Sequence, residues 1–170
     1  MGDIGAGAEM RVFRSTKSGI RVHLDPAPRI ALVRLAEEML ELLDGTADVE
    51  TAAALDPAVQ RLIPDAYPHD PEASDEFRRL TQTDVLEAKR AHATAIRDTF
   101  TADADPLVLD TATAESVLRG FTDLRLVLAE RLDIHEDGDE GRSDSDSAFA
   151  QQLYWLLGAL QEDLVASLMR

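Results

Sequence analysis

Apolar residues recur along most of the chain at the three- and four-residue spacing of amphipathic helices. Leu32, Ala36, Met39 and Leu43 form one such stripe, which begins after an Asp-Pro pair at 25–26 and ends before a glycine at 45. An aspartate followed by proline is typical of a helix start, and a glycine just past the last apolar position is typical of its end. The pattern predicts a helix over about 26–44.

The same apolar spacing, together with residues typical of helix starts and ends, predicts further helices. The Asp-Pro pairs at 56–57 and 70–71 each predict a helix start, and Pro64 must end the first of these helices. A longer apolar stripe predicts a separate helix over about 83–100. Asp110 or Thr111 caps the next helix, which runs to about 132, and the last helix covers about 147–169 with a leucine-rich face.

The N-terminal part has a different period. Residues 20, 22 and 24 are apolar and are separated by polar residues, which is a clean two-residue period. Residues 11–15 follow the same period imperfectly, and the segment 16–19 between them is rich in turn formers. This pattern predicts a β-hairpin, with the short apolar run 107–109 as a strand beside it. We therefore predict a mainly α protein, a helical bundle with a small N-terminal β-hairpin, as a single domain over 11–170 after a flexible leader at 1–10.

Charge is high and unevenly placed. The chain has 17 basic and 33 acidic residues, a formal net charge of −16. Residues 133–146 hold seven acids and one arginine with almost nothing apolar, which predicts a disordered acidic loop. A field of this sign repels phosphate backbones and anionic lipid surfaces, so we expect direct DNA binding to be weak or to occur only within a complex.

The sequence shows no assembled chemistry. There is no cysteine, so thiolate metal sites and thiol switches are excluded. The four histidines, His23, His69, His92 and His135, lack metal-ligand spacing, and we expect His92 to be a satisfied core or rim histidine. We find no nucleophile elbow, no phosphate-binding glycine loop, no signal peptide and no membrane-spanning run. We therefore expect a cytoplasmic protein that is not an enzyme and has no catalytic residues, metal or cofactor.

Two groups of residues are candidates for partner binding. The first is the basic set in the hairpin region, for which the alternative is an ordinary solvated face: Arg11, Arg14, Lys17 and Arg21. The second is Trp155 with Ala159 and Ala166, which lie away from the main apolar stripe of the last helix. Tryptophan is enriched at binding hot spots, so this second group is either a homodimer seam or a docking face. Internal packing against the hairpin is the alternative.

A third feature is an arginine inside an apolar stripe. Arg125 lies between Phe121 and Leu128 on the predicted helix that precedes the acidic loop. A buried arginine usually has a carboxylate partner, so a structural ion pair is favoured over a binding site.

Several segments resemble a known family in their order and spacing. They are 62–72 (LIPDAYPHDPE), 76–81 (EFRRLT) with Asp84 and Lys89, 123–132 (DLRLVLAERL) and 153–162 (LYWLLGALQE), together with the basic hairpin. With these segments the chain resembles the actinobacterial family catalogued as domain of unknown function 2017, from residue 11 almost to its end.

The resemblance implies a cytoplasmic protein with no known enzymatic activity. The family also bears the description oxidative-stress transcriptional regulator of the AosR type, acting with RNA polymerase sigma factors. Redox sensing in that description rests on N-terminal cysteines, which this chain lacks, so only regulation through a protein partner carries over. The leading hypothesis is therefore a non-catalytic transcriptional regulator that binds a sigma factor or RNA polymerase. The alternative is an adaptor or assembly factor for proteolysis or metabolism.

Overall fold

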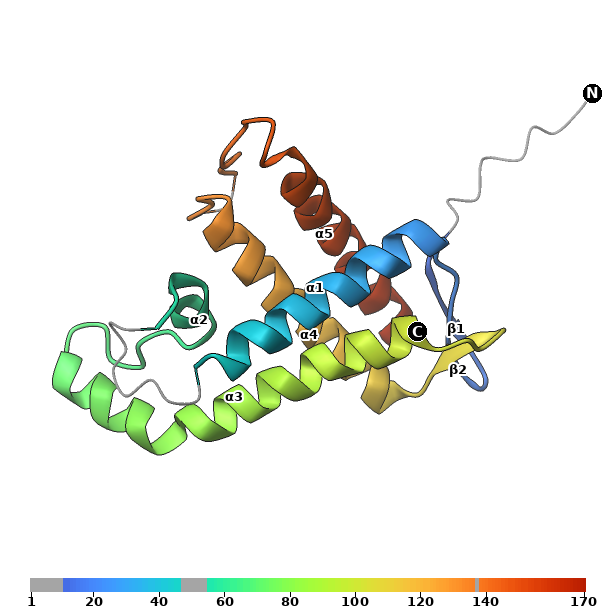
Figure 1. The fold of residues 1–170 in the computed structure, drawn as a ribbon. Coiled ribbons are helices and arrows are strands. Elements are labelled where there is room, and N and C mark those ends of the chain that lie inside the picture. The colour runs from blue at the N-terminus through green and yellow to red at the C-terminus, as the bar shows by residue number, and fades with distance from the viewer. Residues whose placement is uncertain (1–10, 47–54, 137) are drawn as a thin grey trace, which may run out of the picture.

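The computed structural model describes residues 11–46, 55–136 and 138–170. The order of elements is β1 (Phe13–Thr16), β2 (Gly19–Val22), α1 (Pro26–Asp44), α2 (Pro57–Leu62), α3 (Pro71–Thr101), β3 (Leu107–Leu109), α4 (Thr111–Arg131) and α5 (Ala148–Leu168). Figure 1 shows the helices gathered into a bundle with the small sheet at one end. This confirms the predicted mainly α fold with an N-terminal hairpin. The predicted leader at 1–10 lies outside the described residues.

The sheet has three antiparallel strands in the order β1-β2-β3. Ile20 is paired with Leu109, which confirms the predicted strand beside the hairpin. Gly19, at the start of β2, has a φ of 131°, and a Cβ there would lie 2.3 Å from the carbonyl oxygen of Leu109. Only glycine permits both that conformation and that approach.

The helices α1 and α3 lie side by side and run in opposite directions (Figure 1). Near the start of α1, the Arg29 guanidinium donates to the carbonyl oxygens of Phe100 and Ala102 at the end of α3, at 3.3 and 2.7 Å. Arg90 on α3 donates to the carbonyl oxygen of Leu43 at the end of α1, at 2.8 Å. The last carbonyls of a helix have no partner within it, so each helix supplies the C-terminal partner of the other.

The predicted break before residue 83 is wrong, because α3 is one helix of 31 residues. The Thr-Gln-Thr-Asp sequence at 81–84 resembles a helix start, but the hydroxyl of Thr81 donates to the carbonyl oxygen of Phe77 one turn earlier, at 2.9 Å. This bond satisfies the hydroxyl inside the helix, where it does not act as a cap. No proline or glycine follows Pro71 before the helix ends.

Aromatic side chains join the sheet to the helices in the core. Phe13 of β1 and Phe121 of α4 are fully buried, with ring centroids 6.4 Å apart, and Phe100 of α3 stacks on Phe121 at 6.2 Å. Where α3 and α4 meet, a Cβ on Gly120 would lie 2.6 Å from the terminal methyl carbon of Ile96. A glycine there lets the two helices approach closely.

The described part of the acidic segment, predicted to be a disordered loop at about 133–146, makes several contacts with its neighbours. Ile134 is buried, packed with Ala129 and Leu132. The backbone N–H of Arg142 donates to the carbonyl oxygen of Leu132 at 2.8 Å, and Gln151 of α5 donates to the carbonyl oxygens of Glu140 and Arg142. These contacts depend on neighbouring helices, which local composition does not encode.

Candidate partner-binding surfaces

The four basic residues of the hairpin region all lie on the surface. Arg11, Arg14, Lys17 and Arg21 are exposed, and we call them the basic hairpin face. Arg14 and Arg21 are direct cross-strand neighbours. Within the described ranges, none of the four forms an ion pair. Like charges directly opposite each other destabilise a sheet. The pair of Arg14 and Arg21 therefore lowers the stability of the hairpin, and no ion pair within the described residues offsets this loss.

The hairpin is fixed to the end of α5. Asp163 accepts a hydrogen bond from the backbone N–H of Phe13 at 2.8 Å, and the hydroxyl of Ser167 donates to the carbonyl oxygen of Phe13 at 2.7 Å. Side chains of α5 thereby satisfy backbone groups that β1 would otherwise present at the sheet edge. The basic hairpin face is therefore held on a fixed support.

Trp155 is 61% exposed, so the alternative of internal packing against the hairpin is wrong. Its ring meets that of Tyr154 edge-on at 5.4 Å. Ala159 is exposed and Ala166 is half-buried, so the structure brings the three predicted residues to one side of α5. Phe149, in the first turn of the same helix, is also exposed, at 65%.

Arg125 has neutral partners in place of the predicted carboxylate. Its Nη1 donates to the amide oxygen of Gln161 at 2.8 Å, and its guanidinium lies over the ring of Tyr154, 4.7 Å from the centroid. Gly158 faces the guanidinium, and a Cβ there would lie 3.6 Å from it, at an ordinary contact distance. Among the described residues, no carboxylate forms an ion pair with Arg125, because the positions of α5 that face it, 154, 158 and 161, are uncharged. The predicted structural ion pair is therefore corrected to a cation–π contact and an amide hydrogen bond.

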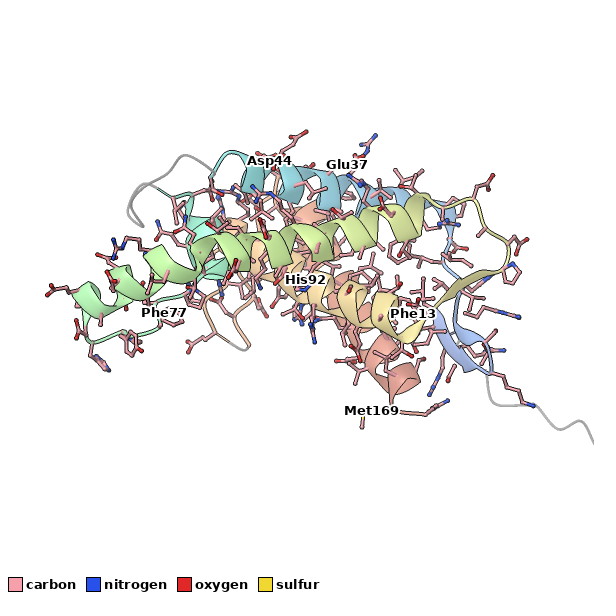
Figure 2. All side chains as sticks on the ribbon, turned by 90° about the horizontal axis from the view of Figure 1, so that it is seen from below. Phe13, Glu37, Asp44, Phe77, His92 and Met169 are labelled. Atoms are coloured by element: carbon pink, nitrogen blue, oxygen red, sulfur yellow. The ribbon has the colours of Figure 1, made fainter. Side chains whose placement is uncertain are left out.

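A buried polar cluster between α3 and α4 was missed from the sequence. The carboxylate of Asp123 lies 2.6 Å from Nζ of Lys89 and 2.9 Å from Nδ1 of His92, and Asp123 is only 2% exposed. His92, labelled at the middle of α3 in Figure 2, is bonded to Asp123, as a satisfied core or rim histidine would be. Only the i, i+3 spacing of Lys89 and His92 hinted that they share a side of their helix.

The cluster has the composition of a structural centre. Its three side chains pair with one another, and no serine, threonine or second acid is bonded to them in the described part of the chain. In the same ranges, no group of three or more histidines and carboxylates is placed to hold a metal ion. No helix of the described residues is long and apolar enough to cross a membrane.

Comparison with known proteins gives matches along almost the whole chain. The model of the family described as "Domain of unknown function (DUF2017)" matches residues 10–168. The oxidative stress regulators AosR of Mycobacterium tuberculosis and Mycobacterium bovis are each 30% identical to this chain in an alignment that covers 91% of this chain and 85% of theirs. A putative oxidative stress regulator AosR of Mycobacterium leprae is 30% identical in an alignment that covers 76% of this chain and 66% of its own. No solved structure matches. The chain belongs to the DUF2017 family.

Proposed function

We propose that this chain is a non-catalytic regulatory protein that acts on transcription by binding a protein partner, a sigma factor or another component of RNA polymerase. The relatives that cover most of its length are named oxidative stress regulators. One observation supports the basic hairpin face as the binding surface. Arg14 and Arg21 are two like charges directly opposite each other, and neither forms an ion pair with an acid among the described residues.

The chemistry of this face favours a partner with exposed carboxylates. Opposed guanidinium groups become favourable when an acidic surface neutralises both of them, and the bonds formed are charge-assisted. Nucleic acid is the weaker candidate, because the net charge of −16 repels a phosphate backbone at longer range. The basic hairpin face would therefore dock a protein and meet DNA only inside a complex.

A role in oxidative stress would not use a thiol switch within this chain. The chain contains no cysteine, so a thiol of its own cannot change state. The signal would reach it through the partner or through a separate sensor. A partner in the RNA polymerase machinery would place the chain in the cytoplasm, where RNA polymerase acts.

Affinity purification from the native host, followed by mass spectrometry, tests the proposal. We expect sigma factor or RNA polymerase subunits to co-purify with the chain. Recovery of protease components or metabolic enzymes alone would contradict the proposal and favour the adaptor hypothesis. A nanomolar, sequence-selective DNA complex formed by the isolated chain at about 150 mM salt would also contradict it, since non-specific binding is typically only about 10⁻⁴–10⁻⁶ M.

A further inference from the structure

One side of α5 lacks the charges that cover the rest of the surface. We call the following six residues the outer face of α5: Ala148, Gln152, Trp155, Ala159, Glu162 and Ala166. At 3.6 residues per turn they fall within about 60° of Trp155 on the helix. The first five are exposed and Ala166 is half-buried, yet Glu162 alone is charged.

Another helix of the same bundle shows the contrast. The exposed positions of α1 include one large apolar side chain, Ile30, but most of the others are charged: Arg34, Glu37, Glu38 and Glu41. Glu37 projects away from the bundle (Figure 2). On α5 the exposed positions instead include Trp155 and, at the end of the helix, Met169, which is 82% exposed. An exposed tryptophan beside small residues on one helix side is typical of a contact surface for another helix.

The spacing of the outer face is the same in both directions. Successive members are four, three, four, three and four residues apart. A second copy laid antiparallel about the level of residue 157 therefore matches the face member for member. Trp155 then meets Ala159 of the second copy, Gln152 meets its Glu162, and Ala148 meets its Ala166.

We infer that the outer face of α5 is the seam of a twofold homodimer, in which the two α5 helices pack antiparallel. Each contact pairs complementary groups: a large ring with a methyl, an amide donor with a carboxylate, and two small residues. Because the contact is isologous, each pair occurs twice. A parallel arrangement is less favourable, since it would oppose Glu162 to Glu162 without a donor to pair with either carboxylate.

The ends of α5 carry opposite charges, which also favours the antiparallel arrangement. The acidic segment is held at the start of α5 through Gln151, and the basic hairpin is held at its end through Asp163 and Ser167. The helix is 21 residues long, about 32 Å, so these charges lie far apart within one copy. Antiparallel packing brings the acidic segment of each copy to the hairpin end of the other.

Trp155 is the only tryptophan, so its fluorescence reports on the seam directly. We expect the emission of the full chain to shift to the blue as concentration rises, and sedimentation equilibrium to give a dimer with a Kd in the micromolar range, because one helix pair buries less area than a standard interface. Ala159→Arg should abolish both changes. Ala91→Arg, at an exposed position of α3, is the matched control and should abolish neither.

Exchange of Gln152 and Glu162 tests the proposed register between the two α5 helices. Gln152→Glu should weaken the dimer about tenfold or more, because it opposes two carboxylates, and adding Glu162→Gln should restore it. Residues 152 and 162 are about 15 Å apart within one helix, so this rescue has no intramolecular explanation. Circular dichroism checks that each variant is folded.

A wild-type chain that stays monomeric at several hundred micromolar would overturn the inference. So would a Gln152→Glu variant that dimerises as well as wild type, or a double variant that does not recover. These measurements need no transcription protein. A negative result would therefore contradict the homodimer and leave the proposed function untouched, and loss of the proposed function would leave the homodimer untouched.

Discussion

Lys89 of α3 places its ammonium nitrogen 2.6 Å from a carboxylate oxygen of Asp123 on α4, at a level where the aspartate is almost completely buried. The second oxygen of Asp123 is bonded to His92, one helical turn from Lys89. A buried carboxylate is tolerated only when both of its oxygens have partners. This cluster therefore fixes how α3 and α4 are placed against each other.

Removal of Asp123 should destabilise the fold strongly. Asp123→Ala leaves Lys89 and His92 facing each other without the carboxylate, and breaking such a buried pair costs about 3–5 kcal/mol of unfolding free energy. Asp84→Ala removes an exposed acid of α3 and should stay within about 0.5 kcal/mol of wild type. Urea unfolding measures both variants. Equal stability of the two would show that the cluster does not hold the helices together.

Two helical glycines should respond in opposite ways to alanine. Gly120→Ala places a Cβ 2.6 Å from Ile96 and 2.9 Å from the backbone carbonyl oxygen of His92, so overpacking should cost about 1–3 kcal/mol. Gly158→Ala meets its nearest atom, in the guanidinium of Arg125, at 3.6 Å, which is ordinary contact. It should be neutral or stabilise by up to about 1 kcal/mol, because glycine is a poor helix former.

Thermal unfolding compares these two variants. Replacing Ile96 by valine in the Gly120→Ala background should recover part of the loss, since it removes the methyl carbon that the new Cβ meets. Loss of stability in Gly158→Ala together with none in Gly120→Ala would contradict the described packing.

Ile134 tests the structure of the acidic segment. The buried contacts of this side chain with Ala129 and Leu132 predict that Ile134→Ala lowers the unfolding free energy by about 2 kcal/mol or more. A disordered segment would tolerate the same change without effect. Denaturant unfolding of the variant, with the exposed Ser145→Ala as control, separates the two outcomes.

The stabilisation that the Asp110 cap gives to the start of α4 should depend on pH. The backbone N–H and the hydroxyl of Thr113 hold the pKa of Asp110 below its ordinary value of 3.8. Since the folded-state pKa is the lower one, the stabilisation is complete above the ordinary pKa and is lost as pH falls through the folded value. Asparagine can also cap a helix but does not titrate.

The melting temperature of wild type relative to Asp110→Asn should therefore fall as the pH drops below 3.8, and should be constant from about pH 5 to 7. NMR titration of the Asp110 carboxyl carbon checks the lowered pKa directly. A difference between the two proteins that does not change with acid would contradict the cap.

Local signals in the sequence were sufficient for most of the elements. Asp56, Asp70 and Asp110 each accept a hydrogen bond from the first turn of their helix, as their positions predict. The strand at 107–109 was also expected from its short apolar run. Asp25 precedes its helix as predicted but makes no side-chain cap bond.

The remaining features depend on how the helices are rotated against one another. The partners of Arg125 come from α5, and those of Asp123 come from α3, so no spacing within one helix identifies them. The burial of Ile134 likewise depends on packing at the end of α4, whereas the composition of its own segment indicated disorder. The place of Trp155 away from the main apolar stripe was predicted from the helix wheel, because that place is a property of α5 alone, whereas its exposure was not, since internal packing against the hairpin had remained the alternative.

The basic hairpin face can be tested against a matched surface arginine. The test compares the double variant Arg14→Glu/Arg21→Glu with a control, the single variant Arg34→Glu. All three arginines are exposed and form no ion pair within the described residues. Each variant is used, beside wild type, to capture RNA polymerase and sigma factor from the native host, with the amounts measured by quantitative mass spectrometry. We predict that wild type and Arg34→Glu recover the same transcription protein and that the double variant loses it about tenfold or more. Equal recovery by the double variant, or recovery of no transcription protein by wild type, would contradict a regulator that acts through this face.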